Sequence, residues 1–209
     1  MKSSIKTALA LGVWALLVGG CASFSAKPDP SRFFTLSALS QEETISPKPP
    51  SESSGISLGI GPITLPGYLD RQEIVIRVAQ NQINLSENDR WAEPLEENFY
   101  RVLSQNVAAI LRADRINAYP WPVDKKPVYQ VEVEVLRFEA NATQEVQLSA
   151  RWAVRNSTKK DVIRYRETRL SRPAKARSTD ASVAALSEVL GDFSREIADA
   201  IEGIDGEGK

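Results

Sequence analysis

Cys21 has the clearest chemistry in this chain and is the single cysteine among its 209 residues. It directly follows Val18-Gly19-Gly20, and an uncharged, almost wholly apolar run from Ala8 precedes those residues, behind Lys2 and Lys6. A basic start, a short apolar run and small residues at the cleavage point are typical of a secretory signal. A cysteine immediately after that point indicates a bacterial lipobox. We expect cleavage before Cys21, a diacylglycerol on its sulfur and an acyl chain on the new amino terminus.

Such acylation anchors a protein in a membrane. Several acyl chains, each contributing about 0.8 kcal/mol per buried methylene, give durable attachment. The apolar run itself, about eleven residues, is shorter than the roughly 20 residues that span a bilayer. Ala22 stands where many inner-membrane lipoproteins of Gram-negative bacteria have Asp. We therefore expect an outer-membrane anchor with the folded part in the periplasm.

The remaining composition argues against catalysis. The chain has no histidine, the commonest general base and metal ligand near neutral pH. Gly55–Gly59 matches the G-x-S-x-G pattern of serine hydrolases, but that elbow needs a following helix and a histidine base. The pairs Glu96/Glu97 and Glu132/Glu134 fit a helix start and a solvated strand face. We expect no catalytic residue, no metal site, no cofactor and no nucleic-acid partner, and no disulfide within the chain.

Charge is distributed unevenly along the second half of the chain. Residues 151–177 contain ten Lys or Arg against two acidic residues, whereas the segment from Ser178 to the end contains eight acidic residues against two basic ones. Pairing between a basic strand region and an acidic helix inside the fold is the simpler explanation. A cationic face toward phospholipid headgroups or an acidic partner is the alternative.

Periodicity predicts the elements that carry these residues. We expect a signal peptide at 1–20, a lipidated tether at 21–31, and one domain at 32–209 with a mobile loop at 40–55, which is rich in Pro, Ser and Glu. Apolar repeats at three and four residues predict two long helices, 94–112 and 179–202, the second capped by Ser178. Apolar runs, several with alternation, predict strands at 32–39, 56–65, 73–79, 83–85, 116–119, 129–135, 146–154 and 161–171.

The last three strands read as an antiparallel meander with one face on the core. The economical fold is α/β (α+β): a single two-layer domain, in which two long helices pack on a mixed, largely antiparallel sheet.

Two short segments combine an aromatic residue, a proline and an Asp-Arg pair beside an element boundary. They are Leu65–Arg71 and Asp89–Leu95. One explanation is structural: Trp91 covers the helix start, while Asp70, Arg71, Asp89 and Arg90 pair across the two loops. The alternative is direct contact with a partner, with these candidate residues: Tyr68, Asp70, Arg71, Arg90 and Trp91.

At these segments the chain resembles the PqiC-like (YmbA-like) ABC-type transport auxiliary lipoproteins. The resemblance begins at Phe33-Phe34-Thr35-Leu36, continues through Gly61-Pro62 and Leu65–Arg71, and reaches the first helix through Asn81 and Asp89–Leu95. It covers most of the mature chain in order and is specific from about 56 to 111.

The resemblance implies a non-enzymatic component of an intermembrane phospholipid transport system. Its partner would be an MCE-domain (PqiB-like) protein whose periplasmic tunnel docks on this subunit at the outer membrane. Because MCE proteins form rings, a homo-oligomeric ring of this subunit is also implied. Two alternatives stay open: a periplasmic-face lipid carrier, which requires a continuous apolar cavity, and a cell-wall enzyme or its activator, which would need Ser-Lys or carboxylate chemistry.

Overall fold

The computed structural model describes residues 29–40, 42, 57–113, 116–159 and 161–207, and Ser31–Lys209 forms one compact unit. The predicted signal peptide, the cleavage point at Gly20 and Cys21, and nearly all of the predicted loop at 40–55 lie outside the described residues.

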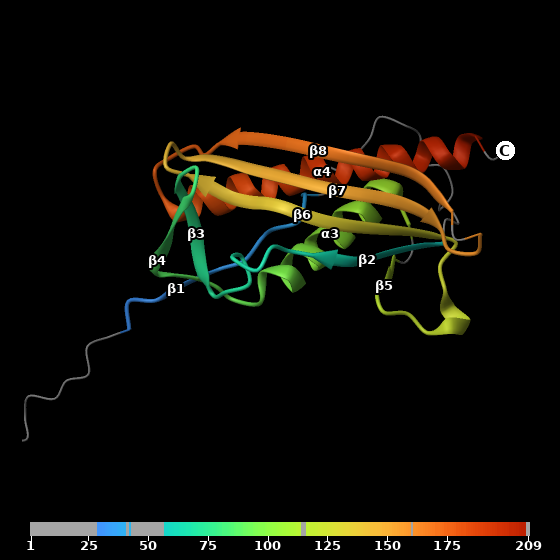
Figure 1. Ribbon diagram of the computed structural model, residues 1–209, viewed down its shortest axis with the longest axis horizontal. Helices are drawn as coiled ribbons and strands as arrows, with labels where there is room; N and C mark the ends of the chain where they lie inside the picture. Colours follow the sequence, from blue (N-terminus) through green and yellow to red (C-terminus); the bar gives the residue numbers. More distant parts are fainter. Residues whose placement is uncertain (1–28, 41, 43–56, 114–115, 160, 208–209) are drawn as a thin grey trace, which may run out of the picture. The chain divides into compact units, whose positions relative to one another are not determined.

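The elements follow one another from a short first strand to a long last helix (Figure 1). In chain order they are β1 (Arg32–Phe34), β2 (Leu58–Thr64), β3 (Glu73–Ala79), β4 (Gln82–Trp91), α3 (Leu95–Leu111), β5 (Ile116–Ala118), the 3₁₀ turn η2 (Val123–Lys125), β6 (Tyr129–Asn141), β7 (Glu145–Asn156), β8 (Val162–Pro173) and α4 (Thr179–Glu207).

Strand β6 organises the sheet, because it has neighbours along both of its edges. One edge pairs along its length with β7, which pairs with β8, and both pairings are antiparallel. The other edge is shared: β2 runs parallel to the first half of β6, and β3 runs parallel to its end at Ala140 and Asn141. Strands β4 and β1 extend the β3 side, and β5 lies outside β2. The sheet is therefore mixed, with its longest pairings antiparallel.

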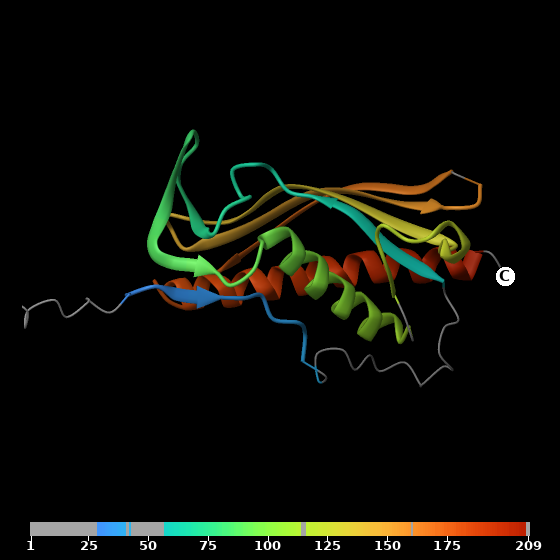
Figure 2. The ribbon, with the colours of Figure 1, turned by 90° about the horizontal axis from the view of Figure 1, so that it is seen from below.

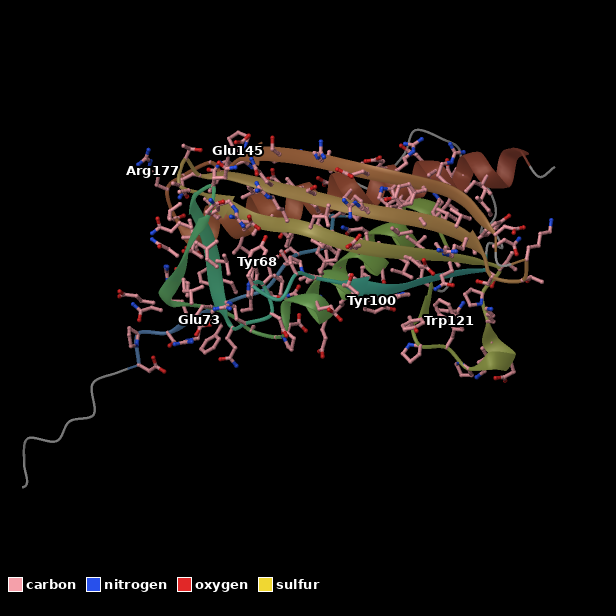
Figure 3. All side chains as sticks on the ribbon, in the orientation of Figure 1. Tyr68, Glu73, Tyr100, Trp121, Glu145 and Arg177 are labelled. Atoms are coloured by element: carbon pink, nitrogen blue, oxygen red, sulfur yellow. The ribbon has the colours of Figure 1, made fainter. Side chains whose placement is uncertain are left out.

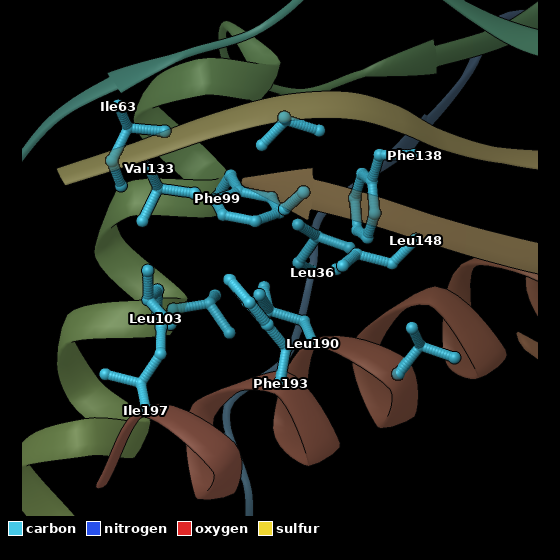
Figure 4. Close-up of a cluster of buried hydrophobic side chains, with 14 of the residues drawn as sticks. Leu36, Ile63, Phe99, Leu103, Val133, Phe138, Leu148, Leu190, Phe193 and Ile197 are labelled. Atoms are coloured by element: carbon cyan, nitrogen blue, oxygen red, sulfur yellow. The ribbon is translucent and has the colours of Figure 1, made fainter. Parts of the chain in front are cut away.

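Both long helices cover the same face of the β6–β8 strands, and the β3–β4 hairpin projects on the side away from them (Figure 2). The interface between helices and sheet is filled by aromatic and aliphatic side chains (Figure 4). Phe99 of α3 lies edge-on to Phe138 of β6 at 5.1 Å between ring centroids, and Trp152 and Phe193 are 6.3 Å apart. All four rings are almost fully buried. Burial of rings of this size contributes strongly to stability.

The predicted α/β (α+β) class, the two helices and the antiparallel meander are confirmed. Ser178 caps α4 as expected, since its hydroxyl accepts a hydrogen bond from the Ala181 N–H at 3.2 Å. Ser57 is the serine of the G-x-S-x-G match. It leads into β2 and not into a helix, so the match does not form the hydrolase elbow.

Three strand predictions are wrong in length, and one of them is the strand expected at 129–135, which continues as β6 to Asn141. The strand expected at 32–39 ends at Phe34, because the next N–H groups bond to helix side chains: Leu36 N–H donates to Asn98 Oδ1 and Leu39 N–H to Asn106 Oδ1. The strand expected at 83–85 extends over the whole of β4, up to Trp91. Its polar, half-exposed middle hid the strand pattern in the sequence.

Gly61 marks an irregularity in β2, where the register with β6 shifts between Ile60 and Ile63. Its φ is +122°, and a Cβ atom there would lie 2.5 Å from the Cβ of Tyr119. Only glycine satisfies both conditions, so the strand can bend while Tyr119 remains close to its backbone.

Candidate functional site

The segment that leaves the predicted tether is fastened first at β1. Arg32 donates to both carboxylate oxygens of Asp89, at 2.7 and 2.9 Å, and Thr179 at the start of α4 donates to the same carboxylate. Asp89 is 5% exposed. The hydrogen bond from Arg32 is the main cause that lowers the pKa of the Asp89 carboxyl below its ordinary value. One carboxylate thus joins β1, β4 and α4, and we call the cluster of Arg32, Asp89 and Thr179 the tether junction.

The next residues, 35–39, lie against the helices and are held by two buried asparagines. Asn98 and Asn106 are 0% and 1% exposed and lie on the apolar side of α3. Besides accepting from the backbone, Asn98 donates to Thr35 Oγ1 at 2.9 Å and Asn106 to Ser194 Oγ at 3.2 Å. Sequence reasoning missed this pair, although two asparagines eight residues apart within an apolar helix stripe were a usable signal. The two asparagines therefore join the segment 35–39 to the buried side of α3.

Tyr68 lies in the β2–β3 turn and covers part of the sheet face opposite the helices (Figure 3). Its hydroxyl donates to Glu139 Oε2 at 2.6 Å, and Arg77 Nε donates to Glu139 Oε1 at 2.6 Å. Glu139 is 3% exposed, and the Arg77 guanidinium lies 5.4 Å from the centre of the Tyr68 ring. Burial, followed by the hydrogen bond to Glu139, raises the pKa of Tyr68 to about 12. This trio attaches the turn to β6 and β3.

The other candidate residues lie at these two boundaries but not with one another. Asp70 is exposed, and Arg71 Nε donates to the Tyr68 carbonyl at 2.8 Å. Arg90 pairs with Glu73 at 3.2 Å, and Trp91, 5% exposed, belongs to the core. The predicted pairing of Asp70, Arg71, Asp89 and Arg90 across two loops is wrong, because these side chains bond elsewhere: Asp89 to Arg32, Arg90 to Glu73, and Arg71 to a backbone carbonyl. Their direct contact with a partner stays a prediction.

Backbone hydrogen bonds nevertheless connect the β2–β3 turn with the end of β4 and with the segment after β1. Trp91 N–H donates to the Gln72 carbonyl at 2.7 Å, and Ala92 N–H to the Phe34 carbonyl at 2.8 Å. The β2–β3 turn, the end of β4 and the segment after β1 therefore form one continuous structure at the entry to α3. This is where the three motifs noted in the sequence meet: Phe33–Leu36, Leu65–Arg71 and Asp89–Leu95.

The arginines of the basic region, residues 151–177, lie on both faces of the sheet at β7 and β8. On the helix face, Arg172 pairs with Glu188 at 3.0 Å and with Asp192 at 2.5 Å, and Arg166 lies 3.6 Å from Glu196. Internal pairing with the acidic helix is confirmed for these two arginines. On the opposite face, Arg151 and Arg169 both contact Glu167 of the same sheet. That face stays accessible, since both long helices lie on the other side.

The polar side chains of these surfaces mainly connect one element to another. Within the described part of the chain, no group of three or more Asp, Glu, His or Cys side chains could hold a metal ion. In those same residues no helix is both long and apolar enough to cross a bilayer. The well-organised polar clusters are ion pairs and hydrogen-bonded trios that hold one element against another.

Comparison with solved structures gives the same fold. The crystal structure of a protein from Xanthomonas campestris superposes with a TM-score of 0.68 at 16% sequence identity, covering 85% of this chain and all of that one. The crystal structure of an uncharacterized protein superposes with a TM-score of 0.67 at 19% identity, covering 82% and 98%. These likenesses concern the fold alone. No curated protein matches the sequence.

The family comparison reaches further, because it covers most of the described unit. Residues 34–198 match the family described as the ABC-type transport auxiliary lipoprotein component. The match begins at the last residue of β1 and ends within α4, so it includes Asp89 and Thr179, the Tyr68 turn and the basic strand β8, but not Arg32. The chain belongs to the family of ABC-type transport auxiliary lipoproteins.

Proposed function

We propose that this protein is a non-enzymatic lipoprotein that docks the periplasmic tunnel of an MCE-type lipid transport system at the outer membrane. Acylated Cys21 would attach it to that membrane, and the folded unit from Ser31 onward would receive the tip of an MCE-domain protein. The family match carries the proposal, since the family is a component of ABC-type transport systems. A ring of several copies would suit a ring-shaped partner.

The filled interior supports docking over the alternative of a lipid carrier. A carrier needs an apolar space for acyl chains, whereas the layer between sheet and helices is occupied by interlocking side chains. The described pockets lie elsewhere. One of about 550 Å³ lies between β2 and the start of α3 and is lined by Tyr100, Tyr119 and three glutamates among others.

The architecture also supports a role under mechanical load. A subunit fixed to one membrane and docked to a structure that reaches another membrane must transmit force between its tether and its docking surface. The Arg32–Asp89–Thr179 cluster and the two buried asparagines resist such a pull at the point where the tether enters. They spread it over α3, α4 and β4.

The test is photocrosslinking in intact envelopes, followed by mass spectrometry of the attached proteins. Crosslinking amino acids at Asp70, Tyr119 and Arg169 sample three separate surfaces, and all three side chains are exposed. We expect an MCE-domain protein to be recovered from at least one position. Recovery of none from any position, in cells that express the partner, would contradict docking.

A variant at the sorting position provides the matched control. Ala22→Asp leaves Cys21 and its acylation in place but should hold the lipoprotein in the inner membrane. We expect radiolabelled palmitate on the wild type and on this variant, outer-membrane fractionation of the wild type only, and loss of the crosslink in the variant. Absence of palmitate from the wild type would refute the anchor itself.

A further inference from the structure

A cavity of about 540 Å³ lies on the face of β6–β8 that neither α3 nor α4 covers. Its polar lining comes from outward-facing residues of all three strands, Gln147 among them, and its charged and hydroxyl side chains are those of Arg137, Ser149, Arg151, Glu167, Arg169 and Ser171. Neither the tether junction nor the Tyr68 trio includes any of them. A volume of this size is within the range of small-molecule sites, about 300–1,000 Å³.

The cavity follows from the strand register. Arg137 of β6 lies opposite Ser149 of β7, which lies opposite Arg169 of β8. Neighbouring strands are about 4.8 Å apart, so the two arginines start roughly 10 Å apart with a short serine between them. Two long cationic side chains thus border a space that the serine leaves open, and Arg151 borders it two residues along β7.

The charges around this space do not cancel. Arg151 lies 3.4 Å from Glu167 and 3.5 Å from Glu134, and Glu167 also contacts Arg169. The lining therefore contains three arginines and one glutamate. Arg137 has no acidic partner among the described residues; its side chain donates only to Gln147 Oε1, at 3.4 Å. Arginines that share too few carboxylates favour an anion in the space between them.

We propose that this cavity binds the phosphate group of an anionic phospholipid headgroup. The planar guanidinium presents two parallel N–H groups that match phosphate oxygens, and the hydroxyls of Ser149 and Ser171 can donate two further hydrogen bonds. The cavity is larger than a phosphate ion needs, which leaves room for the glycerol units on either side of a phosphodiester. Binding here is separate from docking to a protein partner, so either proposal can fail alone.

The test uses the purified, lipidated protein in maltoside detergent and three water-soluble probes. Glycerophosphoglycerol carries the headgroup phosphodiester with its negative charge, glycerophosphocholine adds a positive charge, and inorganic phosphate lacks the glycerol units. Binding is followed by NMR shifts of the arginine Nε–H groups and by calorimetry. We expect saturable binding of glycerophosphoglycerol, at least fivefold tighter than either other probe, and weaker binding at higher ionic strength.

Three variants relate the binding to this cavity. Arg137→Gln with Arg169→Gln should weaken binding at least tenfold, whereas Lys125→Gln with Lys159→Gln removes the same charge from exposed positions elsewhere and should leave it unchanged. Ser149→Leu should weaken it by filling the space without changing the charge. Equal melting temperatures establish that each variant is folded. Undiminished affinity in the arginine variant, or equal affinity for inorganic phosphate and glycerophosphoglycerol, would overturn the proposal.

Discussion

The sheet face opposite the helices has a covered end and an open end, and both are charged. At the covered end, the β2–β3 turn lies over Glu139, whose carboxylate accepts from Tyr68, from Arg77 and from the Phe138 N–H. At the open end, the next outward residue of the same strand is Arg137, which has no carboxylate partner among the described residues. One end satisfies its charges internally, and the other leaves positive charge to be satisfied by a ligand.

The difference follows from the free-energy cost of an unpaired charge, which is high in a buried site and low in contact with water. Once buried, an ion costs several kcal/mol unless its partners are in place, so the covered end must be complete within the chain. In contact with water, arginines can outnumber their carboxylate partners with little loss of stability, because solvent screens their charges. Stability should therefore depend on the covered end, and ligand binding on the open end.

The largest effect is expected at the centre of the covered end. Glu139→Gln removes the charge that Arg77 pairs with, while the Arg77 side chain stays only 17% exposed. Breaking a buried pair from one side should lower the free energy of unfolding by about 3 kcal/mol. Urea denaturation measures it. Glu134→Gln, on the same strand and face but 56% exposed, is the control and should change stability by less than about 0.5 kcal/mol. Equal losses in the two variants would show that the cover has no such role.

A smaller effect is expected from Tyr68→Phe, which keeps the ring over Arg77 and removes only the hydroxyl. Loss of a hydrogen bond to a charged acceptor should cost about 1–2 kcal/mol. Because the folded state raises the pKa of Tyr68 from 10.0 to about 12, the contribution is complete below pH 10 and declines as the pH rises toward 12. Unfolding free energies of the wild type and the variant, compared from neutral pH upward, should therefore converge above about pH 10. A gap that stays constant across that range would contradict the assigned hydrogen bond.

The tether junction also contains a buried carboxylate with partners inside the chain. Its contribution to stability can be tested by lowering the pH. Asp89→Asn should destabilise the protein by about 1 kcal/mol at neutral pH, because the hydrogen bonds from Arg32 and Thr179 lose a charged acceptor. The pKa of Asp89 is lowered in the folded state, so its contribution is present above the ordinary value of 3.8 and is lost as the pH falls below it. The difference between wild type and variant should shrink below about pH 4. A difference that grows in acid would have the wrong sign.

Periodicity was enough to predict the layers of this fold but not its polar junctions. Helix α3 and the strands β6–β8 show clear apolar repeats, and their existence and pairing are confirmed. Strand β4 is different, because its exposed polar residues weaken the alternation on which the prediction depends. The segment 35–39 has apolar residues in a strand pattern, yet its N–H groups bond to Asn98 and Asn106, which are distant in sequence.

The candidate residues show the same limit. Tyr68 was selected from its motif, but its partners Arg77 and Glu139 come from two other strands and had no signal of their own. Alternation does place Arg169 on the opposite face from Arg166 and Arg172, so the sequence could have predicted that the basic stretch divides between two faces. Which face would meet the acidic helix, and which would stay open, depends on where α4 packs. Local periodicity does not contain that information.

The smallest expected effect compares two arginines on opposite faces of β8. Arg169, whose side chain is 78% exposed, points to the open end, whereas Arg172 points to α4 and pairs with Glu188 and Asp192. Arg169→Gln should change the free energy of unfolding by no more than about 0.5 kcal/mol, since exposed pairs contribute little. Arg172→Gln should cost somewhat more, about 1 kcal/mol, because it removes the side chain that bridges two carboxylates of one helix, which keep Lys175 and Arg195 as partners. The order reverses for ligand binding, in which only Arg169 should matter. If the two variants lost stability equally and bound glycerophosphoglycerol equally, the two faces of β8 would not differ in function, and the open end would have no special role.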